Sequence, residues 1–373
     1  MSRFGRYWSE FDWVILITTV ALVGFGSMTV YSATGGGPIA LSNAGVKQAA
    51  FGLVGLLLMF VVASIDYRVL ASFAWPLYGL GLLALALVLV PGIGSEIAGS
   101  RRWFDLQVLT VQPSEFAKLT ALVALSAFIA SRREEMRDPV TFFSSMLIMA
   151  APAALVFEQP DLGTSLVFLV IWFAVALLSP ARLVYFGILA ALAPLFLLFA
   201  WHYLLDDYQH RRWLAFLDPE SNRLGEAFNL IQARISIGSG GLTGFGILGG
   251  TQSQLGLLTV RESDFVFAHA SGMFGFIGMT AMLACFVILL WRCIQVVEIS
   301  RDLLGQCLAI GITSAICFQA FVNIGMNLGL MPVTGITLPF VSSGVSSLWS
   351  FLIGIGILQS IRMHHRKLGF QPD

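Results

Sequence analysis

Ten long apolar runs constrain this chain of 373 residues more than any other feature of its sequence. Each run is about 17 to 25 residues long, the length of a helix that spans a hydrocarbon core of about 30 Å. The sequence therefore predicts an all-α integral membrane protein with about ten transmembrane helices. The expected spans are 12–32, 48–65, 69–91, 113–131, 141–157, 162–179, 182–204, 266–291, 303–328 and 345–361.

The composition excludes an ordinary soluble protein and a nucleic-acid binder. Only 11% of the residues are charged and 57% belong to the set AVILMFWYC, whereas about 25% of a soluble domain is charged. The 21 basic and 21 acidic residues balance and form no block of like charges, so no nucleic-acid partner is expected. Arg3 and Arg6 precede the first run, but no small-residue cleavage site follows it, which favours a retained helix over a signal peptide.

The positions of Lys and Arg predict the orientation, because cytoplasmic loops carry an excess of them. If the N-terminus is cytoplasmic, twelve Lys and Arg residues lie on the inner side of the membrane and eight on the outer side, and Lys118 lies within a span. Five of those eight belong to one long segment between the seventh and eighth spans, residues 205–265, and long loops count little. We expect a single polytopic domain over residues 1–373, with both termini in the cytoplasm. The long loop is expected on the outer side of the membrane, and because long loops are usually functional, the chemistry is expected there.

The long external loop carries two patterns. Leu224, Phe228, Ile231 and Ile235 recur at helical spacing, which predicts either a short amphipathic helix at the membrane surface or an ordinary packing helix. Residues 237–250 contain seven glycines in fourteen positions, which allow close approach of the backbone to a ligand or to another loop. Turn formation is the favoured interpretation, because no strand precedes the run and no Gly-Lys-Ser follows it.

Ionisable residues at membrane depth are candidates for function. Pro113 suits the first position of the fourth span, and Glu115 suits its first turn, where a carboxylate complements the helix dipole. Lys118 lies one turn further on the same face, where a cation is unfavourable without a partner. Lys118 therefore needs a carboxylate or an anionic ligand.

Two aspartates stand at the outer ends of later spans. Asp161 and Asp264 each precede a span, so each could simply cap a helix. Capping does not explain why both aspartates, Glu115 and Lys118 all fall at the side of the long loop. A stripe of Gln319, Asn323 and Asn327 on the ninth span is expected to make helix–helix hydrogen bonds rather than to bind a ligand.

Seven segments together resemble the shape, elongation, division and sporulation (SEDS) family. They follow the family's order along nearly the whole chain: GSRRWFDL (99–106), QPSEFAKL (112–119), EQPDLGTS (158–165), RRWLAFLDPESNRLGEAFNLIQARISIGSGGL (211–242), GTQSQL (250–255), ESDFVFA (262–268) and NIGMNLGLMPVTGITLPFVSSG (323–344). The resemblance implies a peptidoglycan glycosyltransferase that polymerises lipid II outside the bacterial cytoplasmic (inner) membrane, with a class B penicillin-binding protein as partner. FLDPES followed by GTQSQL is more similar to the RodA branch, which acts in elongation, than to the FtsW division branch.

The resemblance also implies roles for single residues. Asp264 matches the essential catalytic carboxylate, and Glu115, Lys118 and Asp161 match other important polar positions. The sequence departs from the family where a Glu-Glu-Leu-Gly run is usual, because this chain has Gly-Met-Phe-Gly at 272–275.

The chemistry of lipid II polymerisation is compatible with this set. The leaving group is a lipid pyrophosphate, a weak base, so no protonating acid is required, unlike in glycoside hydrolases. Asp264 would deprotonate the attacking 4-hydroxyl. Lys118, Arg211, Arg212 or a divalent cation (Mg²⁺ or Mn²⁺) would stabilise the pyrophosphate, and Glu115 and Asp161 would hold Lys118 or the ion. Two alternatives from other classes stay open at this point: a flippase or other transporter of lipid-linked precursors, and a scaffold that only recruits the synthase.

Overall fold

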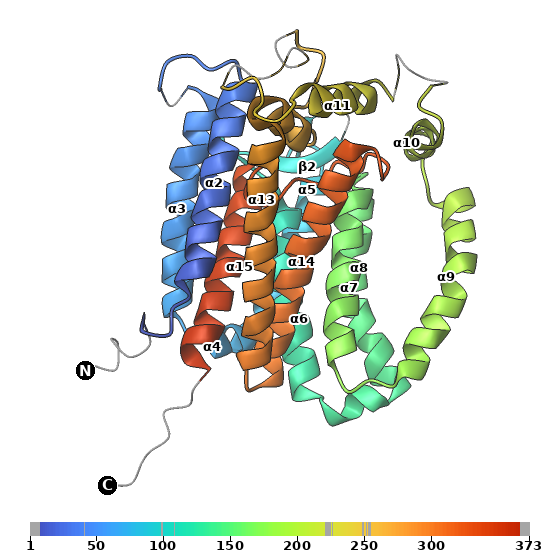
Figure 1. Cartoon of the computed structure of the whole chain (residues 1–373). Helices are drawn as coiled ribbons and strands as arrows, with labels where there is room; N and C mark the ends of the chain where they lie inside the picture. The colour runs from blue at the N-terminus through green and yellow to red at the C-terminus, as the bar shows by residue number, and fades with distance from the viewer. Residues whose placement is uncertain are drawn as a thin grey trace.

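The computed structural model describes residues 8–40, 42–97, 100–107, 109–220, 225, 227–247, 250, 252 and 255–365. Within them the expected membrane-spanning helices are all present, and most of them run side by side (Figure 1). They are α2 (Trp13–Ala33), α3 (Ala44–Ser64), α5 (Ala74–Leu89), α6 (Pro113–Ser131), α7 (Pro139–Phe157), α8 (Leu162–Leu178), α9 (Leu183–Tyr203), α13 (Val266–Ile299), α14 (Leu303–Leu328) and α15 (Val345–His364). Eight are long and apolar enough to cross a membrane, and α5 and α8 are slightly shorter apolar helices. The prediction of an all-α, multi-pass membrane fold is confirmed.

The helix ends follow local sequence signals. The carboxylates of Asp12, Asp138 and Asp302 and the amide oxygen of Asn43 accept hydrogen bonds from the first backbone N–H groups of α2, α7, α14 and α3, as N-cap residues do. Pro113 occupies the start of α6, as predicted. The third predicted span is divided in two at Phe73, into α4 (Tyr67–Ser72) and α5.

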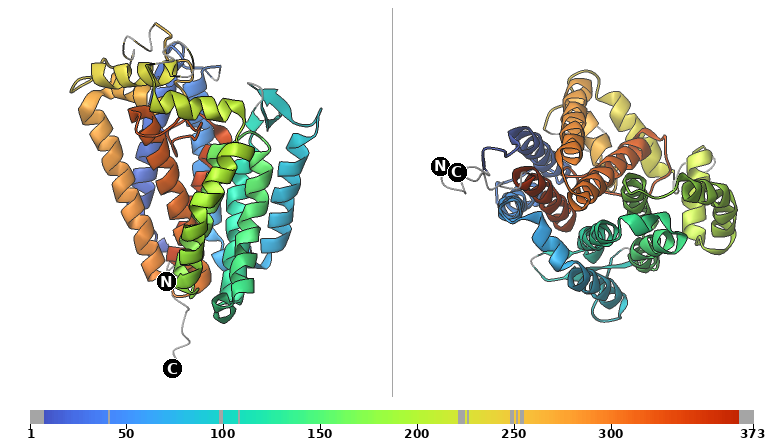
Figure 2. Two further views of the ribbon diagram at one scale, coloured as in Figure 1. Left: turned by 90° about the vertical axis from the view of Figure 1, so that its right-hand side faces the viewer. Right: turned by 90° about the horizontal axis from the view of Figure 1, so that it is seen from below.

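The centre of the bundle is formed by α14 and α15. The side chains of α15 are mostly buried against α3 and α14, and α14 also packs against α8 and α13. By contrast, α9 stands apart from the bundle (Figure 1) and is almost wholly exposed. It is attached near its start, where the Tyr185 hydroxyl donates to the Arg137 carbonyl (2.6 Å) at the end of the 3₁₀-helix η1 (Glu134–Arg137). The two views of Figure 2 show the resulting bundle from the side and from below.

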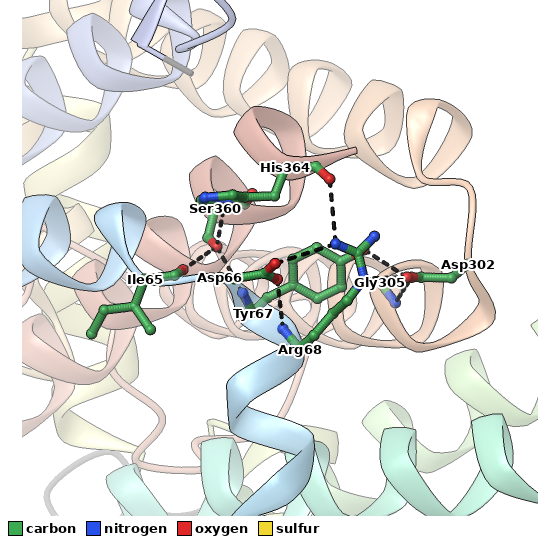
Figure 3. A network of polar contacts seen from close by, with 8 residues as sticks. All are labelled: Ile65, Asp66, Tyr67, Arg68, Asp302, Gly305, Ser360 and His364. Atoms are coloured by element: carbon green, nitrogen blue, oxygen red, sulfur yellow. Dashed lines mark hydrogen bonds and ion pairs between the residues drawn. The ribbon is translucent and has the colours of Figure 1, made fainter. Parts of the chain in front are cut away.

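A polar network joins α4, α14 and α15 at the end of the bundle opposite the long loop (Figure 3). The Tyr67 hydroxyl and the Arg68 Nε both donate to Asp302 Oδ2, at 2.8 and 3.0 Å. The Tyr67 backbone N–H donates to Ser360 Oγ, which in turn donates to the Ile65 carbonyl. The network fixes the turn between α3 and α4 to the start of α14 and the last turn of α15.

A second network at the same end surrounds Asp12. Its carboxylate is buried and lies 2.7 Å from an Arg292 Nη2 and 2.9 Å from an Arg362 Nη1. Gln359 accepts from the Asp12 backbone N–H and donates to its carbonyl. Because two guanidinium groups contact this carboxylate, the start of α2 is held to the ends of α13 and α15.

The long segment between α9 and α13 includes the helices α10 (Asp207–Leu217) and α11 (Phe228–Ser239), which lie across the other end of the bundle (Figure 1). The helix predicted from the apolar pattern of this segment is α11, which packs against α13 and α14. Leu224 of the pattern lies outside the described residues. The helix α10 was not predicted, although Asp206 and Gln209 form a capping box at its start. The segment before α6 forms a small antiparallel sheet that was also not predicted, with strands β1 (Ser95–Ile97), β2 (Ser100–Asp105) and β3 (Thr110–Val111).

The helix α13 is broken at Gly275, where φ is 62°. The glycine-rich loop after α11 supplies the hydrogen bonds that the break removes from the helix. Two of its N–H groups bond to α13 carbonyls above the break, Phe245 to Gly272 and Gly246 to Met273, both at 2.9 Å. Two of its carbonyls, at Gly241 and Leu242, accept from the Phe276 and Ile277 N–H groups below the break, at 2.9 and 3.0 Å.

Close approach to α13 explains a glycine in this loop. A Cβ on Gly244 would lie 2.3 Å from the Met273 carbonyl oxygen, and its φ is +73°, a conformation that glycine adopts without strain. The glycine-rich run thus serves contact between two backbones.

The Tyr67 hydroxyl offers a test of the Figure 3 network. Tyr67→Phe should lower the free energy of unfolding by about 1 kcal/mol, because a partly buried hydrogen bond to a carboxylate is lost. Thermal unfolding in detergent measures this change. Tyr203→Phe is the matched control, since Tyr203 is 76% exposed at the end of α9. Equal effects of the two substitutions would contradict a stabilising role for the network.

Candidate active site

A cavity of about 190 Å³ lies where α10, α11, the start of α13 and the loop after α14 meet. It brings together Asp264 and Arg212, two residues singled out from the sequence. Asp264 Oδ2 and Arg212 Nη1 approach one point near Gly335, at 3.8 and 4.0 Å from where a Cβ would stand. The cavity is lined by Tyr208, Arg212, Ala215, Phe216, Asn229, Leu230, Val260, Asp264, Phe265 and Val333.

The carboxylate of Asp264 is not a helix cap. The N-cap position of α13 is occupied by Phe265, and no side chain caps this helix. Asp264 instead accepts a hydrogen bond from the Ser263 hydroxyl at 3.1 Å and faces the cavity. The capping interpretation of Asp264 is therefore wrong, and the carboxylate remains available for chemistry.

The surroundings of Asp264 make it a stronger base than a free aspartate. Burial raises the pKa of its carboxyl above the ordinary value, and the negative charge of Asp161 acts in the same direction. The hydrogen bond from Ser263 and the charges of Arg212 and Arg102 oppose this rise in pKa without cancelling it. A carboxylate with a raised pKa accepts a proton more readily near neutral pH, as a general base must.

Arg212 extends from α10 over the same cavity. Its Nη1 donates to the Val333 carbonyl at 3.1 Å, its Nη2 donates to the Tyr208 hydroxyl, and its guanidinium lies 4.3 Å from the Tyr208 ring centroid. These three contacts restrict the orientation of the guanidinium, but they use only two of its five N–H donors. Arg212 can therefore present remaining donors to an anion in the cavity. Arg211 is exposed and is not among the lining residues.

Asp161 is a helix cap that also pairs with an arginine. Its Oδ1 accepts from the Thr164 N–H at 3.0 Å, which confirms the capping interpretation. Its Oδ2 lies 3.4 Å from Arg102 Nη1. Arg102 also donates to the Gln159 and Pro160 carbonyls, at 2.8 and 2.6 Å, and so anchors strand β2 to the turn between α7 and α8. This role of Arg102 was not predicted, because the sequence alone does not indicate which carboxylate an arginine in a loop will contact.

Lys118 has the carboxylate partner that the sequence requires. Its Nζ donates to both carboxylate oxygens of Glu115 at 3.0 Å, and the Ser350 hydroxyl donates to Glu115 at 3.2 Å. Both charged side chains are only 4% exposed. They line a separate cavity of about 20 Å³ between α6, α14 and α15, which holds little more than one water molecule. Of the two carboxylates expected to hold Lys118, only Glu115 does so, and the pair does not line the cavity of Asp264.

The side chains available as metal ligands limit how a metal ion could be bound. Among the described residues, no group of three or more His, Cys, Asp or Glu side chains could bind a metal ion. Mg²⁺ is commonly held by one or two carboxylates together with substrate phosphates. The Asp264 cavity therefore fits a cation only if a phosphate-bearing substrate supplies further ligands.

A further cavity of about 260 Å³ lies at the other end of the α14–α15 loop. Lys47, Gln48, Asp105 and Gly344 are among its lining residues. The cavity of about 190 Å³ places the Asp264 carboxylate next to a restrained guanidinium, whereas no arginine is among the lining residues of the other. We therefore take the Asp264 cavity as the candidate active site.

Comparison with known proteins identifies the family of the whole chain. The model of the cell cycle protein family that includes FtsW, RodA and SpoVE matches residues 12–367. The chain belongs to this family. Curated members of the FtsW/RodA/SpoVE family include the peptidoglycan glycosyltransferase MrdB of Escherichia coli K12, 35% identical over 97% of this chain and 96% of that protein. The stage V sporulation protein E of Bacillus subtilis 168 is 33% identical over 95% of this chain and 98% of that protein.

Solved structures of the family share the fold. One is a chain solved in a study of the structural coordination of polymerization and crosslinking by a peptidoglycan synthase complex. It is 32% identical to this chain, with a TM-score of 0.79 over 94% of this chain and 97% of that chain. The rod shape determining protein RodA of Thermus thermophilus is 30% identical, with a TM-score of 0.69 over 96% and 98%. The family and fold expected from the seven sequence segments are confirmed.

The Lys118–Glu115 pair gives a prediction about stability. Lys118→Met leaves a buried carboxylate without its cation and should lower the free energy of unfolding by about 3–5 kcal/mol. The double variant Lys118→Met with Glu115→Gln removes both charges and should recover most of this loss in thermal unfolding. If Lys118 instead contacts the substrate directly, the double variant will be stable but inactive, which would contradict a supporting role.

Proposed function

We propose that this chain is a RodA-type peptidoglycan glycosyltransferase that polymerises lipid II into glycan strands at the outer face of the cytoplasmic membrane during cell elongation. The assignment of catalytic residues rests on one observation, namely that Asp264 and Arg212 line the same cavity. The family supports the activity, since relatives that align over nearly the whole chain are peptidoglycan glycosyltransferases. The substrates are lipid II and the lipid-linked glycan strand.

In the proposed reaction, the 4-hydroxyl oxygen of one sugar attacks the anomeric carbon of the other. The bond from that carbon to the pyrophosphate oxygen breaks, and its electrons leave with the pyrophosphate. Asp264 accepts the proton of the attacking hydroxyl. Arg212 donates hydrogen bonds to the departing pyrophosphate, where negative charge develops. Attack opposite the leaving group inverts the anomeric centre.

The residues outside the cavity have supporting roles in this proposal. Asp161 and Arg102 are close enough to influence the charge of Asp264 and fix the α7–α8 turn. Glu115 and Lys118 hold α6 against α15 beneath the site. Arg211, exposed on α10, would add positive potential at the approach to the cavity.

A divalent cation, Mg²⁺ or Mn²⁺, is part of the proposal as a second source of positive charge. Substrate phosphates would supply most of its ligands, with Asp161 as the protein carboxylate, and Asp264 would stay uncoordinated as the base. When bound, it would neutralise charge on the pyrophosphate.

A class B penicillin-binding protein is the proposed partner. Its support is the similarity to a chain from a peptidoglycan synthase complex in which polymerization and crosslinking are coordinated. The flank of α13 and α14 offers a surface on which a single transmembrane helix of the partner could pack in the bilayer. Exposed apolar side chains on this flank are Phe276, Ile277, Val287, Trp291 and Phe321.

Purified protein reconstituted with lipid II alone, and again with the partner, tests the activity. Formation of glycan strands supports the polymerase, and the partner should raise the yield. Relocation of intact lipid II across the bilayer without any glycan would instead support a flippase.

Replacement of Asp264 by Asn should abolish most glycan synthesis. An amide cannot accept the proton, and general base catalysis contributes typically about 10²- to 10⁴-fold in rate. The variant should keep the wild-type unfolding temperature, because Asp264 caps no helix. Asp161→Asn is the matched comparison and should lose less activity, since Asn also serves as an N-cap. Near-normal synthesis by Asp264→Asn would contradict the base assignment.

The same assignment predicts a pH dependence. The rate should fall as the pH drops through the pKa of Asp264, because the protonated carboxyl is no longer a base. Since burial raises this pKa, the fall should begin at a higher pH than for an exposed aspartate, whose pKa is about 3.9. Initial rates of glycan formation between about pH 4 and 8 measure it. A rate that stays flat to the acid end of this range would contradict the prediction.

The proposed orientation places α10 outside and both termini in the cytoplasm. In a variant without the four native cysteines, Leu217→Cys should react with a membrane-impermeant thiol reagent added to cells whose outer membrane, if present, has been permeabilised. Leu217 is 69% exposed near the end of α10. Glu134→Cys, in the η1 helix between α6 and α7, should stay unlabelled until the cytoplasmic membrane is opened. Reversed labelling would overturn the orientation.

A further inference from the structure

Two buried amides of α14 hold the backbone of Asp264. Asn323 Nδ2 and Asn327 Nδ2 donate to the Asp264 carbonyl oxygen at 3.1 and 2.9 Å. Both asparagine side chains are completely buried. A carbonyl oxygen has two lone pairs, so the two amides can occupy both acceptor positions of this oxygen.

The same amides connect Asp264 to its neighbours. The second N–H of Asn323 donates to the Ile336 carbonyl at 2.7 Å, and that of Asn327 donates to the Asn323 carbonyl at 2.8 Å. Asn327 Oδ1 accepts from the Ala268 N–H in the first turn of α13 at 3.1 Å. The pair therefore joins α14, the start of α13 and the α14–α15 loop around one residue. A buried polar network of this kind is rigid when its donors are satisfied.

The two residues before Asp264 are fixed in the same way. The Ser343 N–H donates to the Glu262 carbonyl at 2.7 Å, and the Ser342 hydroxyl donates to the Ser263 carbonyl at 2.6 Å. Three consecutive carbonyls, 262 to 264, are thus held by α14 and the loop that follows it. Only the side-chain torsions of Asp264 remain to direct its carboxylate into the cavity.

We infer that Asn323 and Asn327 are positioning residues for the Asp264 carboxylate. The inference rests on the proposed role of Asp264 as base. Catalytic groups must be held within about 0.5 Å of their productive geometry, and a displacement of about 1 Å can cost about 10²-fold in rate. Fixing the backbone of residue 264 from α14 meets this requirement without any contact between the asparagines and the substrate.

Ordinary helix–helix hydrogen bonding is the competing explanation, and the sequence pattern alone favours it. That explanation predicts a loss of stability with little change in catalysis by the folded protein. The two explanations therefore differ in kcat and in the pH profile.

The test compares Asn323→Ala and Asn327→Ala with Gln319→Ala. Gln319 lies one turn earlier on α14, is 2% exposed, and its side-chain oxygen has no hydrogen-bond partner among the described residues. The measurements are kcat and KM for lipid II, the acid side of the pH–rate profile, and thermal unfolding, all made with the partner present.

Both asparagine variants should lose about 10²-fold in kcat with KM nearly unchanged, while Gln319→Ala keeps its kcat. The acid side of the pH profile should move to lower pH in the asparagine variants only. The reason is that a loosened Asp264 is better hydrated, and its pKa returns toward the ordinary value.

If an alanine variant fails to fold, serine at the same position serves the same test. A serine hydroxyl is too short to reach the Asp264 carbonyl, but it can bond to the carbonyl four residues earlier in the helix. Asparagine variants that match Gln319→Ala in kcat and in pH profile would overturn the inference. If Asp264→Asn is also active, the proposed base has failed; if it is inactive, only the positioning role has failed.

Discussion

The bilayer requires every backbone polar group within it to be paired inside the protein, and the rest of this structure depends on that constraint. It explains why the apolar runs form helices and why the one break inside α13 has a dedicated partner. At Gly275 the helix loses intrahelical hydrogen bonds, and the glycine-rich loop after α11 replaces them from outside the helix. The break separates a short upper part of α13, which begins beside Asp264, from the long part that crosses the bundle. The same loop thus seals the break and ties α11 to the helix that carries the candidate site.

Buried charge obeys the same constraint at both ends of the bundle. At the end opposite the long loop, Asp12 is neutralised by Arg292 and Arg362, and these contacts join helices from the beginning and the end of the chain. Towards the end that carries the long loop, Glu115 neutralises Lys118. In the candidate site the balance differs: Asp264 has a single hydroxyl donor and a nearby guanidinium, and its pKa is raised. A carboxylate that is held but incompletely neutralised can accept a proton, whereas the paired ones serve structure.

The spans could be predicted from the sequence because a membrane helix is defined by length and apolarity alone. The segments at the end with the long loop were harder to predict. The helix α10 is mostly polar, and its capping box was the only signal. Strands of two to six residues leave no usable periodicity. The break at Gly275 falls within a continuous apolar run, so hydropathy could not indicate it.

The candidate site was predictable in its residue types and only partly in its contacts. Asp264 and Arg212 are 52 positions apart, and only the fold brings them to one cavity. Local spacing correctly paired Lys118 with Glu115, three residues away. It could not show that Asp161 meets Arg102, or that Asn323 and Asn327 contact the backbone of Asp264.

The proposal assigns the acceptor hydroxyl to Asp264 and the pyrophosphate of the substrate to Arg212, within one cavity. A structure of the protein with its partner and a bound polyprenyl pyrophosphate, the leaving group of the proposed reaction, tests this claim most directly. The account predicts phosphate density within hydrogen-bond distance of the Arg212 guanidinium in the Asp264 cavity. Phosphate density in the cavity of Lys47 and Gln48 instead, with the Asp264 cavity empty, would contradict it.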